Sequence, residues 1–368
     1  MIDKKNIIKI LIDAHIFDGK FQGTRTYLKG LYNELIWMLP NFEFIFIADE
    51  KSSLTNEFPE APNVRFLSFS TTSQIKRLLF EIPKIIEREN IDFAHFQYIS
   101  PIQKKCKYII TNHDILFTEE RYKAFFPWKF RITKGPLFKW SSRNSDILLT
   151  VSEYSKKQIS LTYKMCSESI YVTPNAVMDT GVWYGNTKRE EKKEIIFVSR
   201  IEPRKNHVGL IQSFLNLGLD KRGFRLVFVG KYDLNYPEYE QILQDNGKRL
   251  KGLVANYSGL SSEDLLKRYK SAALAVFPSL AEGFGIPPLE AAMLGVKVVC
   301  SNTTAMEDFD FFKYWVDPSN QNELDMNIFN ALNDINYPFD EIRLAIERKY
   351  NWKIGANVLK EQLLKITE

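Results

Sequence analysis

Short apolar runs alternate with longer segments of helical periodicity along the whole chain. The first half holds such runs at 7–15, 42–49, 108–114, 146–153 and 169–175, and the second half at 194–201, 224–232, 273–279 and 297–302. Helical patterns lie between them, for example at 26–39 and 261–272. Nearly continuous apolar runs that alternate with helices are typical of βαβ units with parallel sheets. The pattern therefore predicts the α/β class.

The two series of runs are separated by a polar, charged stretch without periodicity at 175–194. A chain of 368 residues is long enough for two domains. We therefore predict an N-terminal domain at 1–176, a linker at 177–193, a second domain at 194–350 and a closing helix at 351–368 that packs back toward the N-terminal domain. Two doubly wound, Rossmann-like domains leave a cleft, and ligands of such sheets bind beyond the carboxyl ends of the strands.

Composition limits the function classes only weakly. The net charge of +5 is compatible with anionic small molecules, acidic membranes or nucleic acid. The three scattered cysteines favour a reducing compartment over a disulfide framework or a zinc site, and the four histidines lack metal-ligand spacing. Lys9 and Asp13 interrupt the apolar opening, and no uncharged run approaches the ~20 residues of a membrane span. We therefore expect a cytoplasmic protein.

The segment FPSLAEGFGIPPLEAAMLG, at 277–295, follows an apolar run and contains two acids eight positions apart. Gly283 and Gly285 suit a tight loop, and the double proline suits the first turn of a helix that ends at Gly295. Glu282 then lies in the loop and Glu290 in the first helical turn. The free amides of 284–286, from Phe284 to Ile286, favour an anionic group. The alternative, in which Glu290 only stabilises the helix and Glu282 is solvated, has equal support from spacing alone.

A second candidate is the basic loop in FVSRIEPRKNHVGLI, at 197–211. Arg200, Arg204 and Lys205 follow a predicted strand and precede a helix, so they suit a diphosphate. An ordinary solvated basic loop is the alternative, and the clustering of the charges favours the functional interpretation.

Two further candidates follow strands in the N-terminal half. In TNHDILF, at 111–117, His113 can donate a hydrogen bond to a substrate hydroxyl and Asp114 can orient it or act as a base. A structural histidine is the usual alternative. In DGKFQGTRTYLKG, at 18–30, Gly19 and Gly23 permit close approach of the backbone to a ligand. This loop has neither a full dinucleotide fingerprint nor a P-loop.

Together these segments resemble the retaining glycosyltransferases of family GT4, which have the two-domain GT-B fold. EGFGIPPLEAAMLGVKVVCSN resembles the E-x7-E signature of that family, and VSRIEPRKN its diphosphate loop. TVSEYSKKQI (150–159) and PNAV (174–177) resemble its interdomain segments, and NHD its acceptor-domain histidine loop. The resemblance covers nearly the whole chain, and the order and spacing of the motifs make it specific.

The resemblance implies transfer of a sugar, mannose-like by preference, from a GDP- or UDP-linked donor to a hydroxyl of a glycan or lipid-linked acceptor. It implies catalytic roles for Glu282, His113, Arg200 and Lys205. Arg200 and Lys205 hold the diphosphate, Glu290 the ribose, and His113 hydrogen-bonds the sugar. It further implies donor contacts at Gly23, Glu282, Gly283, Phe284, Gly285 and Ile286. In this family the leaving phosphate takes the acceptor's proton, so no separate base is expected.

The same resemblance implies catalysis without metal or other cofactor. An Asp-x-Asp sequence occurs at 308–310, but in a connection that the resemblance places away from the diphosphate. The chain departs from the family pattern at Ala176, where glycine is usual, and at 303–309, which lacks a proline before Glu307.

The segment 121–143, RYKAFFPWKFRITKGPLFKWSSR, carries seven basic residues, seven aromatic residues and no acid. Such a segment suits an anionic membrane surface or single-stranded nucleic acid, or else a buried helical pair with solvated charges. The lipid-linked acceptors of many related enzymes favour the membrane. We expect peripheral contact with the inner face of the plasma membrane and no nucleic-acid partner.

The sequence therefore predicts a glycosyltransferase of surface polysaccharide, lipopolysaccharide or glycolipid synthesis. The alternatives are a nucleotide-sugar epimerase or phosphorylase of the same fold, or a non-catalytic protein that binds a nucleotide sugar or nucleic acid.

Overall fold

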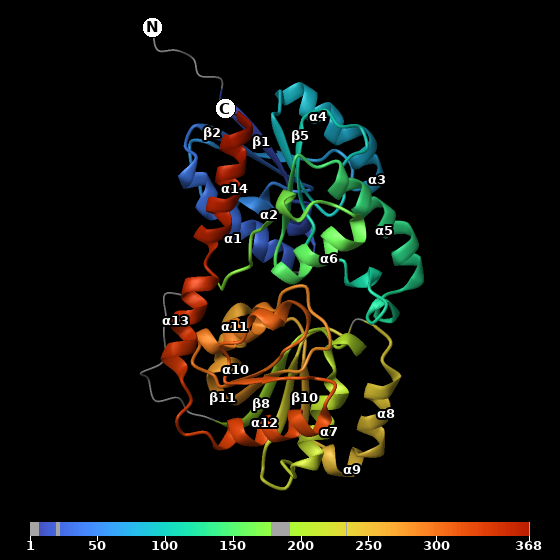
Figure 1. The fold of residues 1–368 in the computed structure, drawn as a ribbon, viewed down its shortest axis with the longest axis vertical. Coiled ribbons are helices and arrows are strands. Elements are labelled where there is room, and N and C mark those ends of the chain that lie inside the picture. Colours follow the sequence, from blue (N-terminus) through green and yellow to red (C-terminus); the bar gives the residue numbers. More distant parts are fainter. Residues whose placement is uncertain (1–6, 20–22, 178–191, 233, 368) are drawn as a thin grey trace. The chain divides into compact units, whose positions relative to one another are not determined.

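The computed structural model describes residues 7–19, 23–177, 192–232 and 234–367. The chain divides into two compact units (Figure 1). Unit 1 comprises Met1–Ala176 with Tyr350–Glu368, and unit 2 comprises Val177–Lys349. Most of the predicted linker, at 178–191, lies outside the described residues.

Unit 1 contains a seven-stranded sheet in the order β3-β2-β1-β4-β5-β6-β7, and every pair of neighbours is parallel. Five of its strands were predicted from the sequence, whereas β3 and β4 were not. The strands are β1 (Ile8–Asp13), β2 (Phe42–Ala48), β3 (Val64–Ser68), β4 (Phe93–Gln97), β5 (Lys107–Thr111), β6 (Ile147–Thr150) and β7 (Ile170–Val172).

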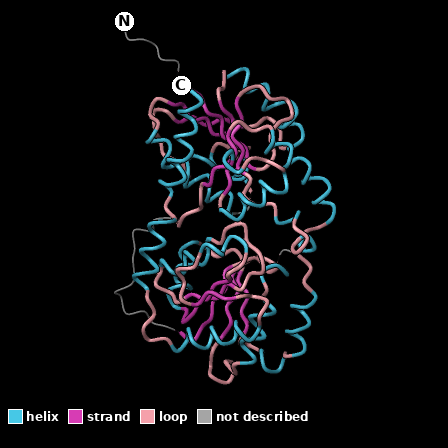
Figure 2. Tube along the Cα trace, viewed as in Figure 1, coloured by secondary structure: helices cyan, strands magenta, loops and turns pink. Residues whose placement is uncertain are grey.

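Both faces of this sheet are covered by helices, which explains why its strands are apolar on both sides (Figure 2). One face packs into a core that includes Phe96, Tyr108 and Phe138. On the other face Tyr32 contacts Phe44 and Phe46 edge to face. The helices of unit 1 are α1 (Gly23–Met38), α2 (Ser52–Thr55), α3 (Gln74–Lys76), α4 (Ile82–Glu89), α5 (Trp128–Arg143), α6 (Glu153–Tyr163) and α14 (Trp352–Thr367).

The last helix, α14, packs on α1 within unit 1, although the two come from opposite ends of the chain (Figure 1). Gly30 makes this contact possible, because a Cβ there would lie 2.1 Å from the ring of Trp352. Trp352 in turn meets Tyr27 of α1 at a centroid distance of 6.4 Å.

Unit 2 contains a six-stranded parallel sheet in the order β10-β9-β8-β11-β12-β13. Its strands are β8 (Lys192–Val198), β9 (Arg225–Val229), β10 (Val254–Tyr257), β11 (Ala272–Phe277), β12 (Val298–Ser301) and β13 (Tyr314–Val316). Its helices are α7 (His207–Asn216), α8 (Pro237–Asp245), α9 (Gly247–Leu250), α10 (Ser262–Ser271), α11 (Ile286–Met293), α12 (Gln321–Asn333) and α13 (Phe339–Lys349). The sequence did not predict the edge strands β10 and β13.

Each sheet has a point at which the strand order reverses. It lies between β1 and β4 in unit 1 and between β8 and β11 in unit 2. Loops that leave strands on either side of such a point diverge and create a crevice for ligands. The predicted α/β class, with two doubly wound parallel sheets, is confirmed.

Candidate active site

The reversal point of unit 2 brings together two segments that the sequence singled out. The loop after β8 carries Arg200 and a 3-10 turn, Pro203–Lys205, and the loop after β11 carries Glu282. A backbone bond from Leu280 N to Arg204 O, 2.9 Å long, ties the two loops together. The chain therefore builds one site from residues nearly eighty positions apart.

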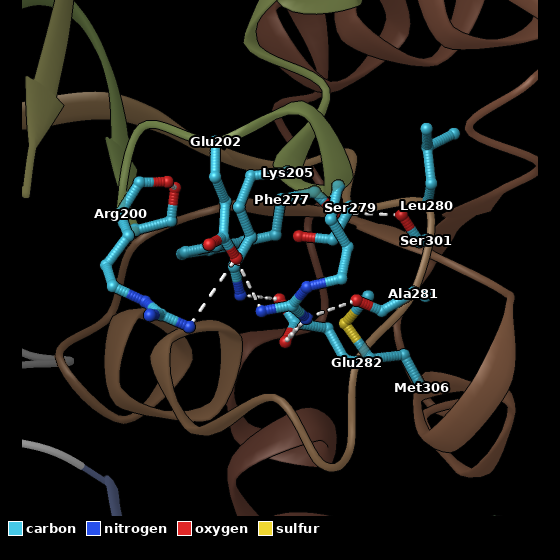
Figure 3. A network of polar contacts seen from close by, with 12 residues as sticks. Arg200, Glu202, Lys205, Phe277, Ser279, Leu280, Ala281, Glu282, Ser301 and Met306 are labelled. Atoms are coloured by element: carbon cyan, nitrogen blue, oxygen red, sulfur yellow. Dashed lines mark hydrogen bonds and ion pairs between the residues drawn. The ribbon is translucent and has the colours of Figure 1, made fainter. Parts of the chain in front are cut away.

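Glu282 lies at the centre of a buried ionic network (Figure 3). One carboxylate oxygen accepts a hydrogen bond from Lys205 Nζ, and the other lies 3.1 Å from Arg204 Nη1. Arg204 also donates to the carbonyl of Ala281 at 2.6 Å and, through Nη2, to Glu202 at 2.6 Å. Arg204 thus holds Glu282 on one side and Glu202 on the other.

The two cations keep Glu282 ionised despite its burial. Burial alone would raise its pKa, but the charges of Lys205 and Arg204 outweigh that effect and lower the pKa to about 2. Burial and the charge of Arg204 lower the pKa of Lys205, while Glu282 opposes them. The site therefore holds a fixed negative charge at neutral pH, next to a buried ammonium group.

Arg200 differs from its two basic neighbours. Its side chain is 55% exposed, and its guanidinium lies 3.6 Å from Glu202, which also receives the hydrogen bond from Arg204. An exposed guanidinium at the edge of a buried ionic network is well placed to meet an incoming anion.

The loop that follows Glu282 leads directly into α11. Gly285 has a φ of +107°, so the backbone requires glycine, and a Cβ there would also lie a tight 3.0 Å from the side chain of Met306. The predicted helix after the double proline is present, with proline in the first turn, and Gly295 has a φ of +73° just after it ends. Gly283, Phe284 and Ile286 connect Glu282 to this helix.

Glu290 is the fifth residue of α11, so it lies just beyond the first turn in which the sequence placed it, and it is partly buried. Burial raises the pKa of its carboxyl to about 7. No hydrogen bond to this carboxyl is present within the described part of the chain. The nearby hydroxyl of Tyr269 is buried without a hydrogen-bond partner, and its pKa is raised by burial and by the charge of Glu290. Both groups can therefore bind a polar ligand.

The remaining two predicted site residues lie in unit 1. Gly23 opens α1 after β1, and among the described residues a Cβ there would meet nothing within 4 Å. Packing therefore does not require this glycine. His113 follows β5 and is 7% exposed, and burial lowers its pKa to about 3, so the ring is neutral.

A chain of buried polar groups fixes the orientation of His113. Its Nε2 lies 2.6 Å from Gln97 Oε1, and Gln97 Nε2 lies 3.3 Å from His95 Nε2. His95 Nδ1 in turn lies 2.7 Å from the hydroxyl of Tyr32. With Gln97 Oε1 as the acceptor, His113 carries its proton on Nε2 and presents Nδ1 as an acceptor. The sequence suggested a donor at this position, whereas the free nitrogen here accepts.

The sequence did not identify Gln97 as a site residue, because the apolar pattern does not predict the strand β4 that carries it. It is the last residue of β4, at the reversal point of the sheet of unit 1. Glu202 was likewise missed, and Arg204 was noted only as part of the basic cluster. The one sequence signal for Glu202 is an acid between two arginines that follow a strand.

The Asp-x-Asp sequence at 308–310 has an ordinary structural setting. Asp308 ends a 3-10 helix, Thr304–Asp308, and Asp310 is exposed and lies 3.3 Å from Lys349 Nζ. Within the described ranges, no group of three or more His, Cys, Asp or Glu side chains could hold a metal ion. The absence of a metal cofactor remains a prediction.

Comparisons with known proteins agree with this fold. Residues 26–179 match the family described as Glycosyltransferase Family 4, and residues 185–340 match Glycosyl transferases group 1. The chain is 27% identical over 333 residues to O-antigen chain mannosyltransferase B of Escherichia coli, which covers 82% of this chain and 86% of that protein. A glycosyltransferase structure from Rickettsia africae superposes with a TM-score of 0.71 at 16% identity and covers 99% of both chains. The structure of Anabaena Alr3699/HepE in complex with UDP-glucose superposes with a TM-score of 0.70 at 16% identity and covers 97% of this chain and 100% of that one.

Two doubly wound parallel sheets, with these loops at their reversal points, define the GT-B fold. The chain belongs to the group 1 glycosyltransferases and has the N-terminal domain of family 4. The prediction that the chain is a glycosyltransferase is thus confirmed, whereas retention of anomeric configuration stays a prediction.

Proposed function

We propose that this glycosyltransferase moves a mannose-like sugar from a nucleotide diphosphate sugar to a hydroxyl of a glycan or lipid-linked acceptor, with retention of anomeric configuration. The observation that carries the proposal is the ionised, buried Glu282 held between Lys205 and Arg204. A fixed carboxylate stabilises positive charge on a sugar that loses its leaving group. The cations beside it stabilise the negative charge that the leaving diphosphate gains.

The geometry of unit 2 supports separate roles for its charged residues in this proposal. A diphosphate competes with Glu282 for Lys205 and attracts the exposed Arg200. Arg204 is held by Ala281 and Glu202, so it stays with Glu282 when Lys205 turns toward the donor. Glu290 accepts hydrogen bonds from the ribose, because it is partly buried and its carboxyl has no hydrogen-bond partner among the described residues.

The donor is a GDP- or UDP-linked sugar in this proposal. The E. coli relative is a mannosyltransferase by name, which favours mannose, and a solved protein of the same fold is in complex with UDP-glucose. The relative's role on the O-antigen chain favours lipopolysaccharide or another surface polysaccharide as the product. His113 Nδ1 accepts a hydrogen bond from a sugar hydroxyl, and Gly23 lets the backbone approach the donor. The basic cluster replaces a metal ion.

We further propose that the enzyme works in the cytoplasm at the inner face of the plasma membrane. In the parts of the chain that the structure describes, no helix is long and apolar enough to cross a bilayer. The basic and aromatic segment 121–143, which includes α5, is the surface that would contact anionic lipid.

The donor assignment is tested by thermal unfolding of the wild type and Glu290→Ala with GDP, UDP, dTDP and ADP, each with and without Mg²⁺. A nucleotide at a hundred times its dissociation constant stabilises the protein by about 2.7 kcal/mol. We expect a shift with GDP or UDP that does not need Mg²⁺ and is weaker in the variant. No shift with any nucleotide overturns the donor site, and a shift that needs Mg²⁺ overturns metal independence.

The reaction itself is tested with the GDP- or UDP-linked sugar that the first experiment selects. Proton NMR of the glycosylated acceptor distinguishes a retained from an inverted anomeric centre. Glu282→Gln should lose most of its turnover, while nucleotide binding persists. An inverted product, or release of an altered free sugar without acceptor, contradicts the proposal.

A further inference from the structure

A cavity in unit 1 lies apart from the loops described above. It has a volume of about 520 Å³ and is bounded by α5, the end of α6 and the segment after Phe117. Phe117 and Tyr163, both buried, form its apolar wall. Gly135 of α5 lines it as well, and a Cβ there would lie 3.1 Å from Phe117 Cε2. The glycine thus keeps part of the helix surface hollow.

Two cations flank this hollow on α5. Arg131 and Lys139 stand four residues before and four residues after Gly135, so all three share one side of the helix. Neither charged group has a hydrogen bond or ion pair with another described residue, and Arg131 Nε is buried without a partner. A third cation, Lys123, lines the cavity together with its ion-pair partner Glu120, which is 84% exposed and is the one acid among the lining residues. The cavity therefore has an excess of positive charge and a buried donor without an acceptor.

The adjacent side of α5 is apolar and exposed. Trp128 and Ile132, one turn apart, are 59% and 61% exposed. Phe126, Phe130 and Phe138 instead pack against the core, where Phe130 and Phe138 each meet Phe117 at 5.4 Å. Of the aromatic residues of this segment, Trp128 alone is exposed, and the others are buried or partly buried. An exposed tryptophan and isoleucine beside unpaired cations are typical of a surface that enters the headgroup region of a membrane.

We propose that the α5 cavity binds the phosphate group of an anionic phospholipid. The guanidinium of Arg131 and the ammonium of Lys139 donate hydrogen bonds to the phosphate oxygens, while Trp128 and Ile132 enter the interface beside it. Charge complementarity favours this occupant, because the lining carries three cations against one acid, and 121–143 as a whole contains seven basic residues and no acid. The inference deepens the proposed membrane contact, and it depends neither on the donor nor on glycosyl transfer.

The test is co-sedimentation of the full chain with phosphatidylcholine vesicles, with and without phosphatidylglycerol. Arg131→Gln with Lys139→Gln removes the two cavity charges. Lys129→Gln with Lys134→Gln removes two charges from the same helix outside the residues that line the cavity, and serves as the matched control. Both variants lose the general attraction to an anionic surface equally. The cavity variant should lose about a further tenfold in affinity, because it alone removes direct donors to phosphate.

Each result decides the proposal. Equal losses in the two double variants, or equal binding to vesicles without phosphatidylglycerol, overturn it. Saturable binding of inorganic phosphate without vesicle binding overturns the lipid source and leaves a site for free phosphate. Gly135→Leu fills the hollow without a change of charge and should reproduce the loss. The nucleotide-induced shift in melting temperature, measured on the same variants, should stay unchanged. A failure of lipid binding is thereby distinguished from a failure of the donor site or of folding.

Discussion

Arg204 shows how a residue that need not touch substrate can control one that does. Its side chain is 10% exposed, and its guanidinium donates hydrogen bonds to Ala281, Glu282 and Glu202. Lys205 is the other partner of Glu282, but the diphosphate competes for it under the proposed function. Arg204 is therefore the partner that keeps Glu282 in place and ionised when the donor is bound.

Arg204→Gln should lower kcat by about ten- to a hundredfold, the effect of one lost charged hydrogen bond. The pKa of Glu282, about 2 in the wild type, should rise because one of the two lowering charges is gone. The acid limb of the kcat/KM profile then moves to higher pH. Arg204→Lys keeps the charge and should restore part of the activity. A lower melting temperature with unchanged turnover and pH profile would reduce Arg204 to a purely structural role.

Glu290 gives a second prediction, because its pKa is raised whereas that of Glu282 is lowered. Burial raises its pKa to about 7, above the ordinary value of 4.5, so it is protonated at pH 6 and ionised at pH 8. An ionised carboxylate is the better acceptor for ribose hydroxyls. The affinity for the intact sugar nucleotide, whose diphosphate does not titrate in this range, should therefore rise about tenfold from pH 6 to pH 8.

Glu290→Gln should bind this donor with an affinity that does not change with pH. Free energies of unfolding supply an independent check. A raised folded-state pKa favours the folded wild type at low pH, and this contribution fades as the pH rises from 4.5 through 7. Stability of the wild type relative to Glu290→Gln should fall over that interval. Isothermal titration calorimetry and chemical denaturation measure the two effects, and flat profiles for both would exclude an ionisation of Glu290 near pH 7.

At the scale of elements, the apolar pattern predicted nine of the thirteen strands in the described chain. It did not predict β4 or the polar contacts that its side chains make with other elements. β4 lies beside β1 in the middle of its sheet, yet FAHFQ includes His95 and Gln97, which burial ordinarily disfavours. These side chains are tolerated because Tyr32, Thr111 and His113 satisfy them. Such partners come from other elements, so no local pattern reveals them.

The candidate site likewise has residues that local motifs reveal and contacts that they do not. Arg200, Lys205, Glu282 and Glu290 follow strands that the pattern identified, and their motifs are local in sequence. The pairing of Glu282 with Arg204 depends on the distance between two loops that are nearly eighty residues apart. Similarly, the burial of Phe130 and Phe138 depends on where Phe117 packs, which the pattern of 121–143 does not show.

The contact between α1 and α14 permits a prediction about stability. Gly30→Ala should destabilise the protein by about 1–3 kcal/mol, because the new Cβ would lie 2.1 Å from the ring of Trp352. Helix propensity alone predicts a gain of about 1 kcal/mol from the same change. Gly355→Ala, in α14, is the matched control, because its Cβ would lie 3.4 Å or more from its neighbours. Chemical denaturation should show a loss for the first variant and none for the second, and equal effects would contradict this packing.

At the scale of the whole molecule, the chain consists of two compact units, each with its own sheet and its own reversal point. In unit 2 the loops at that point, 199–206 and 278–285, carry the ionic network around Glu282. The α5 cavity, in contrast, is formed entirely by residues of unit 1. The two proposed ligands should therefore leave separate footprints on one chain.

Hydrogen exchange followed by mass spectrometry locates these footprints. A nucleotide diphosphate at a hundred times its dissociation constant slows exchange by up to about a hundredfold where opening requires ligand release. The strongest slowing should cover 199–206 and 278–290, because the diphosphate and ribose contacts lie there under the proposed function. Vesicles with phosphatidylglycerol should instead slow exchange in 117–139. In Lys205→Ala the nucleotide footprint should vanish while the vesicle footprint stays. Nucleotide protection centred on 117–139, or loss of both footprints in that variant, would mean that the two sites are not separate.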